Sequence, residues 1–565
     1  MSTPPAESPP SAGTALLPGR REGWSKVTVA ALAAAVMLPI IFVLSTLATP
    51  SREIWAHLWE STLSRMLINT VTVVAGVALC SLCIGTGLAW LTTAYRFPGR
   101  RFFDRALILP LAMPSYILAF VFIATFDYIG IVQTTLRGWF GEEVWFPDIY
   151  TVSSAVTVLT LTLYPYVYLL ARSAFRSQSG YIFDAARTMG YTRGRTFFKL
   201  VLPLARPSLI AGVSLAAMEA LGDFATVRFF NVPTLSDGVF RIWEGMMNRE
   251  AAMEVAGLLS LVALLLVLTE LRARRSARYT QPGGETPEVT PVTLNGWPAA
   301  AAAGICALVL ALGFLLPTIQ LAVWSFSEIL AQGPGGTLNV AFVRYLATTS
   351  SLAGAAALLT VAWALLLSHA GRMSEGRVTA VATRVATLGY AMPGAVIAVG
   401  VLLTVAALDR GYSAALAGRG VSAGPILTGS LLALLYAYVV RFLAVGYNSV
   451  DAALAGVRPS LAEAARTLGA TPSAVLLRVH TPLVSRGVFT AAVLVFVDVM
   501  KELPVTMLLR PFGMDTLAIW GYLLASEGFW EAAAVPSLSI LLAGLLPVML
   551  LAGLSGRGVT RTIRN

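Results

Sequence analysis

Charged residues are scarce in this sequence of 565 residues. They make up 12% of the chain, about half the share usual for a soluble protein, while 57% of the residues are hydrophobic. Such a chain cannot bury all of its apolar surface in a water-soluble fold, so composition indicates a membrane protein. The net charge of +11 is carried by basic residues between apolar runs, of which only Lys26, Lys199 and Lys501 are lysine. This pattern does not indicate a nucleic-acid partner, which would need clustered charge on a soluble face.

Cysteine and histidine are also rare, with three of each. Cys80, Cys83 and Cys306 all lie in apolar runs, and the CxxC formed by the first two is interpreted as two small residues on one helix face. The histidines are His57, His369 and His480. Their spacing matches no metal-ligand pattern, and no GxxxxGK[ST] phosphate loop is present. We therefore expect no catalytic residues, no metal site and no cofactor in this chain.

Long apolar runs dominate the rest of the sequence. A membrane helix needs about 20 apolar residues. Twelve segments qualify, at 27–49, 66–94, 106–126, 150–171, 207–227, 252–270, 299–323, 351–369, 385–408, 426–446, 487–507 and 532–553. The first run is longer than a signal-peptide core and no clear cleavage site follows it, so we expect it to be retained.

Basic residues fall mainly on one side of these spans. If the N-terminus is cytoplasmic, most Lys and Arg lie in inside segments, for example Arg100 and Arg101, Arg193 and Arg195, and Arg561 near the end. This asymmetry predicts that both termini are cytoplasmic.

The two halves of the chain repeat each other. Asp184-Ala-Ala-Arg-Thr-Met-Gly190 corresponds to Glu463-Ala-Ala-Arg-Thr-Leu-Gly469, and residues 184–204 match 463–483 at eight of 21 positions. Met113-Pro114 and Met392-Pro393 share the same offset. Six spans per half place both halves the same way up. We predict an all-α integral membrane fold of two parallel six-helix repeats. The expected divisions are a disordered tail at 1–26, membrane domains at 27–271 and 299–556, a cytoplasmic linker at 272–298 and a tail at 557–565.

The repeated segment precedes the fifth span of each half on the predicted cytoplasmic side. In the second half, Pro459-Ser460 and Glu463 form a capping-box pattern, Gly469 supplies a turn, and a second short helix is expected from Thr471-Pro472 to Thr481. The first half repeats the pattern through Gly190. An ordinary amphipathic interfacial helix is the alternative, but it does not account for two copies at equivalent positions.

This helix–glycine–helix pattern resembles the cytoplasmic loop of type I ATP-binding-cassette (ABC) import permeases. The resemblance implies that each segment is a coupling helix for a separate ATPase subunit. The implied coupling residues are Asp184, Ala185, Ala186 and Gly190 in the first half, and Glu463, Ala464, Ala465 and Gly469 in the second. Asp184 departs from the family's glutamate, which puts one contact in doubt. The implied partners are an ATPase homodimer that binds ATP and magnesium, a periplasmic or lipid-anchored substrate-binding protein, and membrane lipids.

Ionisable residues lie inside the fifth and eleventh spans, where they are costly and usually functional. Glu219 and Asp223 align with Asp498 and Glu502, and each pair is four residues apart, a spacing that shares one helix face. These four carboxylates are predicted to line the translocation pathway. The alternative is structural: Lys501 neutralises a neighbouring acid while the others bind backbone donors.

The stretches 221–233 and 498–513 look like the fused permeases of ferric-iron importers. This resemblance implies that the chain lies in a bacterial inner membrane. The resemblance implies iron(III) as cargo, moved by alternating access. Permeases for thiamine, polyamines or oxyanions such as sulfate and molybdate are alternatives. A secondary transporter of the major-facilitator type and an integral-membrane enzyme are alternatives of other classes.

Overall fold

The structure is a computed structural model that describes residues 19–48, 55, 59–178, 186, 188–245, 248–275, 291–333, 340–374, 376–418 and 424–557. Within these residues nearly all regular structure is helical. Eleven helices are long and apolar enough to cross a membrane, and a bent pair, Pro472–Leu483 with Ser485–Met500, makes a twelfth when counted as one span. The predicted all-α membrane fold with about twelve spans is confirmed.

The spans of the first half are α1 (Gly19–Ser45), α3 (Ser64–Ala94), α5 (Ser115–Phe126), α7 (Val152–Ser177), α10 (Leu202–Gly222) and α13 (Arg249–Arg275). Those of the second half are α14 (Trp297–Leu310) continued by η5 (Ala311–Leu315) and α15 (Leu316–Gln332), α16 (Val340–Met373), α18 (Gly394–Ala417), α19 (Leu431–Ala455), α23 (Ser485–Met500) and α26 (Trp530–Arg557).

Short helices connect these spans. Those beside the first-half spans are η1 (Thr46–Ala48), η2 (Trp59–Leu63), α4 (Arg100–Ala106), η3 (Leu109–Ala112), α6 (Ile131–Phe140), α9 (Arg193–Thr196), η4 (Phe197–Val201), α11 (Ala225–Phe229) and α12 (Leu235–Gly245). Those of the second half are α17 (Arg377–Ala386), η6 (Leu388–Ala391), α20 (Pro459–Thr467), α21 (Pro472–Val475), η7 (Leu476–His480), α22 (Thr481–Leu483), α24 (Pro504–Leu509) and α25 (Leu517–Ser526). Strands β1 (Tyr95–Arg96) and β2 (Val292–Thr293) pair in parallel.

Four predicted spans are interrupted by a break in the helix. The expected helices at 106–126 and 385–408 begin only after Pro114 and Pro393, because a residue that precedes proline is disfavoured in the helical conformation. The expected helices at 207–227 and 487–507 end at Gly222 and Met500, and the short helices α11 and α24 follow each break. Spans five and eleven therefore each end at the predicted carboxylates.

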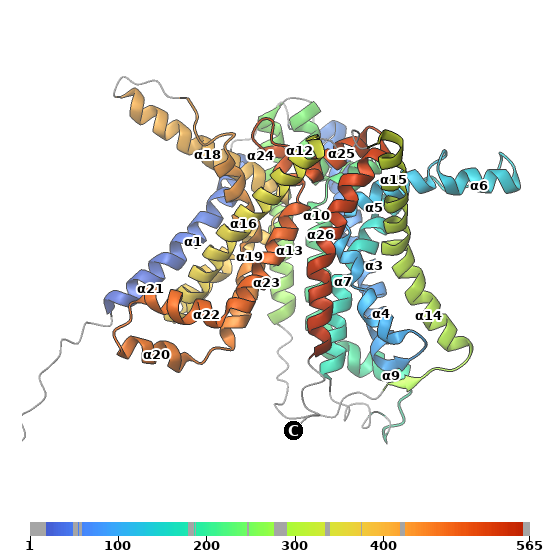
Figure 1. Ribbon diagram of the computed structural model, residues 1–565, viewed down its shortest axis with the longest axis horizontal. Coiled ribbons are helices and arrows are strands. Elements are labelled where there is room, and N and C mark those ends of the chain that lie inside the picture. Colours follow the sequence, from blue (N-terminus) through green and yellow to red (C-terminus); the bar gives the residue numbers. More distant parts are fainter. Residues whose placement is uncertain are drawn as a thin grey trace, which may run out of the picture.

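The first span of each half packs on the other half. Helix α1 contacts α16, α17 and α18, while η5 and α15 contact α7 and α5 of the first half. Figure 1 shows α1 alongside α16 and α18 at one edge, and α14 and α15 beside α5 at the other. At the α1–α18 contact, Gly400 lies against the backbone of Pro39 with no space for a Cβ atom. This exchange of first helices joins the two repeats.

The connecting helices separate onto two sides. Figure 1 shows α9, α20, α21 and α22 at the lower side, where α26 also ends. Helices α6, α12, α24 and α25 lie at the upper side in the same view. This arrangement agrees with the alternation of segments expected from the basic residues.

Candidate functional site

A pocket lies where the two halves meet, between the broken ends of α10 and α23. It has a volume of about 150 Å³ and is lined by residues from both halves. Across it, Gly222 lies against Pro393, with 3.4 Å between the position of a Cβ atom on Gly222 and the Pro393 Cα atom. All four predicted carboxylates line this central pocket, namely Glu219, Asp223, Asp498 and Glu502. Their role in translocation stays a prediction.

Asp223 is held by the first half alone. Its carboxylate accepts a hydrogen bond from the Ser115 hydroxyl at the start of α5. It also accepts hydrogen bonds from the Thr226 backbone N–H at 2.8 Å and the Thr226 hydroxyl at 3.0 Å. The carboxylate thus caps helix α11, whose first N–H groups lack partners within the helix.

Glu502 occupies the equivalent place in the second half but has a different partner. Arg441 on α19 pairs with it, with 3.3 Å between Nε and Oε1. The Val505 backbone N–H, at 3.3 Å, makes a weaker contact at the start of α24. Gly394 stands where Ser115 stands in the first half. A Cβ atom there would approach Arg441 Nη1 to 2.8 Å and Glu502 Oε1 to 2.9 Å, so glycine leaves the space that the ion pair uses.

Asp498 and Lys501 form a second ion pair, with 2.9 Å between Nζ and Oδ1. The expectation that Lys501 neutralises a neighbouring acid therefore agrees with the structure, as does the expectation that other acids meet backbone donors. One expectation is wrong. Glu219 and Asp223 do not share a helix face, because α10 ends at Gly222 and Asp223 adopts an extended backbone.

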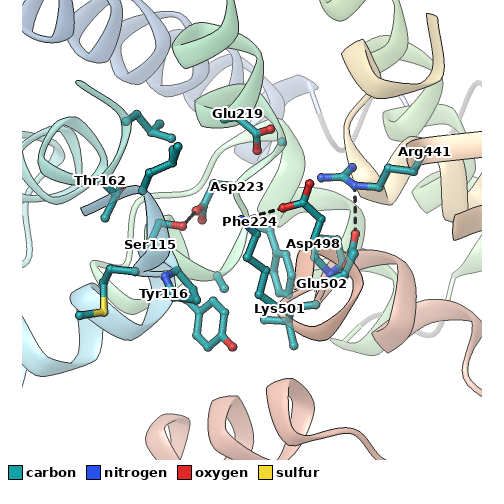
Figure 2. A pocket seen from close by; sticks show the side chains of 18 of the residues that line it. Ser115, Tyr116, Thr162, Glu219, Asp223, Phe224, Arg441, Asp498, Lys501 and Glu502 are labelled. Carbon is teal, nitrogen blue, oxygen red and sulfur yellow. Dashed lines mark hydrogen bonds and ion pairs between the residues drawn. The ribbon is translucent and has the colours of Figure 1, made fainter. Parts of the chain in front are cut away.

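Glu219 differs from the other three carboxylates. Among the described residues it has no hydrogen bond or ion pair, although it lines the central pocket. The side chains of Tyr166 and Tyr390, which also line the pocket, lie within electrostatic reach of it. Figure 2 shows Glu219 at the edge of the open space between Asp223 and Asp498. It is therefore the one carboxylate of the pocket without a polar partner among the described residues.

The charges of the pocket do not cancel. Four carboxylates face one lysine and one arginine, which leaves a formal charge of two negative units when all are ionised. Sequence reasoning found the acids but missed Arg441, Ser115, Tyr166 and Tyr390. The signal for Arg441 was present, because it is an arginine inside the predicted span 426–446.

The predicted coupling segment of the second half, residues 459–483, lies on the lower side as a helix, a turn and a helix. Helix α20 has no buried residue. Its Leu461 is 47% exposed, and Leu468, which directly follows the helix, is 88% exposed. Gly469 has a φ of +84°, a conformation that favours glycine. The Thr471 hydroxyl then accepts a hydrogen bond from the Ala474 N–H at 3.3 Å and starts the next helix. Glu463, Ala464 and Ala465 lie in the middle of α20.

Two details of this segment differ from expectation. The predicted capping box is absent: Arg458 is the N-cap of α20, no side chain caps it, and Ser460 lies inside the first turn. Pro459 explains this, because its fixed φ suits the first helical position. The second helix continues past Thr481 to Leu483. Pro482 does not end it, because it lies in the first turn of α22, where proline is tolerated.

The first-half segment shares the turn but not the bend. Gly190 has a φ of +73°, and Thr192 caps α9 by accepting a hydrogen bond from the Arg195 N–H at 3.4 Å. Ala186 is buried. Asp184 and Ala185 lie outside the described residues. From Arg193 the chain runs as one helix to Gly222, whereas the corresponding helices of the second half meet at 81°.

Comparison with known proteins identifies the family to which the chain is similar. Residues 81–279 and 356–561 match the family described as "Binding-protein-dependent transport system inner membrane component". The chain is 24% identical to the Fe(3+)-transport system permease protein FbpB 2 of Haemophilus influenzae over 538 residues, 95% of this chain and 99% of the relative. It is 31% identical to the molybdenum transport system permease protein ModB of Escherichia coli over 177 residues, 31% of this chain and 73% of ModB. It is 29% identical to the sulfate transport system permease protein CysT of Escherichia coli over 201 residues, 34% of this chain and 69% of CysT.

The family match overturns the alternatives of a major-facilitator transporter and of a membrane enzyme. It occurs once in each half and together covers most of the chain. The chain therefore belongs to the family of binding-protein-dependent transport system inner membrane components, as a fused ABC permease that carries the family's membrane domain twice.

Proposed function

We propose that this chain is the permease subunit of an ABC importer for iron(III). The observation that carries the proposal is the extent of one match. The Fe(3+)-transport permease of Haemophilus influenzae aligns with 95% of this chain, both halves included, whereas the molybdenum and sulfate permeases align with about a third of it.

The charge of the central pocket supports a cation as cargo. Its formal charge of two negative units would attract Fe(III) and repel dianions such as molybdate and sulfate. Glu219 supports the proposal further, because its carboxylate is not already held by a neighbour within the described chain. Permeases for thiamine, polyamines or an oxyanion remain the alternatives that the experiment below tests.

ATP hydrolysis is assigned to separate subunits. We infer that an ATPase homodimer, which binds ATP and magnesium, docks at the two segments that contain Gly190 and Gly469. A periplasmic or lipid-anchored substrate-binding protein would deliver cargo to the opposite side. The docking side and both termini would then be cytoplasmic, in a bacterial inner membrane. The domain division at 27–271 and 299–556 belongs to the same proposal.

The implied cycle is alternating access. Closure of the ATPase dimer draws the docking segments together, and the central pocket opens to the loaded binding protein. Hydrolysis then returns the pocket to the inward side. In this cycle the permease residues bind and orient cargo, and no covalent step occurs in the chain.

Uptake in reconstituted vesicles tests this function. The chain is incorporated with its candidate ATPase and binding protein, and uptake of radioactive iron is measured with ATP inside. We expect ATP-dependent iron accumulation that excess molybdate, sulfate, thiamine or spermidine does not reduce. Uptake of one of those competitors in place of iron would overturn the cargo. Iron uptake driven by a proton gradient with no ATPase present would overturn the mechanism.

A further inference from the structure

An apolar groove lies on the outer surface of the protein, between helices α1 and α17. It has a volume of about 520 Å³, and all of its lining residues belong to these two helices. We call it the α1–α17 groove. Figure 1 shows α1 at one edge of the bundle, with its lower end at the side that carries α20, α21 and α22. The groove therefore faces the surrounding lipid and is separate from the central pocket.

One wall of the groove consists mainly of short side chains. Ala30, Ala33 and Ala34 line it, and Met37 follows one turn later on the same face of α1. Ala30 and Ala34 are exposed. These residues lie inside the membrane span Ser25–Ala48, so this wall is within the apolar part of the membrane.

The other wall is formed by α17. Val378, Val381 and Val385 line the groove, and their spacing of three and four residues places them on one helix face. Val378 is 74% exposed and Val381 is 58% exposed. Apolar side chains this exposed are unfavourable in water but favourable against hydrocarbon. Both walls thus suit the acyl chain of a lipid.

One edge of the groove is positively charged. Arg377, the one charged residue that lines it, is exposed and has no polar or ring partner among the described residues. Arg384 follows seven residues later, two turns along the same edge of α17, and its exposed side chain also has no partner in the described chain. Neither α17 nor the segment 25–45 of α1 contains an acidic residue. These two positive charges are thus left for a ligand.

The charged edge lies at the boundary of the membrane on the lower side. The end of α16 is held against α20 and the residues just before it. Arg372 donates a hydrogen bond to the Val457 carbonyl at 3.1 Å, and Arg466 of α20 donates one to the Met373 sulfur. Helix α17 begins four residues after Met373, at Arg377. Lipid phosphate groups lie at this level, whereas the alanines of α1 lie at the level of the acyl chains.

We propose that the α1–α17 groove binds an anionic phospholipid of the membrane. The planar guanidinium of Arg377 would donate hydrogen bonds to two phosphate oxygens, and Arg384 would attract the remaining negative charge of the headgroup. One acyl chain would lie in the groove against the alanines and valines. A zwitterionic lipid carries an ammonium group that the two arginines repel, so it should bind less tightly. This site goes beyond the proposed transport function and does not depend on it.

The lipid would also strengthen the junction between the two halves. Helix α1 belongs to the first half, whereas α17 belongs to the second half and leads through η6 to Pro393 at the central pocket. A lipid that contacts both helices binds the folded chain and loses its site when they separate. Its binding should therefore raise the unfolding temperature of the protein.

Lipid titration of the full chain tests the site. The detergent-purified protein is titrated separately with phosphatidylglycerol and phosphatidylethanolamine of identical acyl chains, and bound lipid is counted by native mass spectrometry. Arg377→Gln removes the charge at an exposed position, so the fold is not at risk. Ala34→Phe keeps both arginines but fills the groove. Arg486→Gln, which alters an exposed arginine of α23 outside the groove, is the matched control.

Phosphatidylglycerol should bind the wild type about tenfold more tightly than phosphatidylethanolamine, and R377Q should remove most of that difference, as expected for loss of a charge-assisted hydrogen bond. A34F should weaken the binding of both lipids, and R486Q should bind like the wild type. Phosphatidylglycerol should also raise the unfolding temperature of the wild type more than that of R377Q. The proposal is overturned if the wild type binds the two lipids equally, if R377Q or A34F keeps the wild-type affinity for phosphatidylglycerol, or if R486Q loses as much affinity as R377Q.

Discussion

Replacing Arg441 with leucine would leave the carboxylate of Glu502 in the central pocket without its cation. The Glu502 side chain is 2% exposed and that of Arg441 is 16% exposed, so water screens the pair little. At 3.3 Å and an effective dielectric constant of 20, the attraction between the two charges is about 5 kcal/mol. Breaking a buried pair from one side typically costs about 3–5 kcal/mol, because the remaining charge stays desolvated.

The comparison that isolates this effect is a double-mutant cycle. Wild type, R441L, E502Q and the R441L/E502Q double variant are purified and heated at one scan rate while intrinsic fluorescence is recorded. We expect R441L to unfold at the lowest temperature. The double variant should unfold closer to the wild type than R441L does, because no unpaired charge remains. Equal unfolding temperatures for R441L and the double variant would refute the argument that the two groups compensate each other.

Three further changes test other parts of the molecule. Gly469→Ala should weaken ATPase association about tenfold in a pull-down, because a residue with a Cβ atom costs roughly 1–2 kcal/mol in the left-handed conformation. The control Gly456→Ala, at a φ of −76°, should have no effect. Glu219→Gln should lower the initial rate of iron uptake roughly tenfold without changing the unfolding temperature, because its charge faces the pocket and has no partner in the described structure to lose. His480→Leu should destabilise the protein by about 1–3 kcal/mol, because it removes the 3.0 Å hydrogen bond between the Nδ1 atoms of His480 and buried His369. A His369→Leu/His480→Leu double variant should recover part of that loss in the same unfolding assay.

The spans and the turns at Gly190 and Gly469 could be predicted from sequence because their causes are local. A run of about 20 apolar residues is long enough to cross the membrane whatever surrounds it. Gly190 and Gly469 mark the turns because both adopt a positive φ, which few other residues tolerate. Repetition of the whole pattern at a constant offset then reveals two equivalent halves. In the second-half segment, only the helix start was predicted wrongly, because Pro459 takes the first helical position and leaves Ser460 inside the first turn instead of at the N-cap.

The arrangement of the central pocket could not be predicted in the same way. Apolar content does not reveal that α10 stops at Gly222, because Phe224 and Ala225 continue the hydrophobic run beyond the break. The partner of Glu502 lies 61 residues earlier, at Arg441, and the contact exists only once two spans pack together.

The two halves have carboxylates at equivalent positions but hold them through different partners. This difference suggests that the two halves move unequally during transport. Asp223 is bound by Ser115 and Thr226, neutral groups of its own half that can shift with it. Glu502 is bound by a cation on α19, and breaking that pair costs more free energy than breaking a neutral hydrogen bond. The helix before Glu502 also bends by 81°, whereas the helix before Asp223 is continuous. A pull on the straight first-half helix would reach the pocket as a rigid displacement. The same pull on the second half would be absorbed partly at the bend, so the first half is the one expected to open the contact between Gly222 and Pro393.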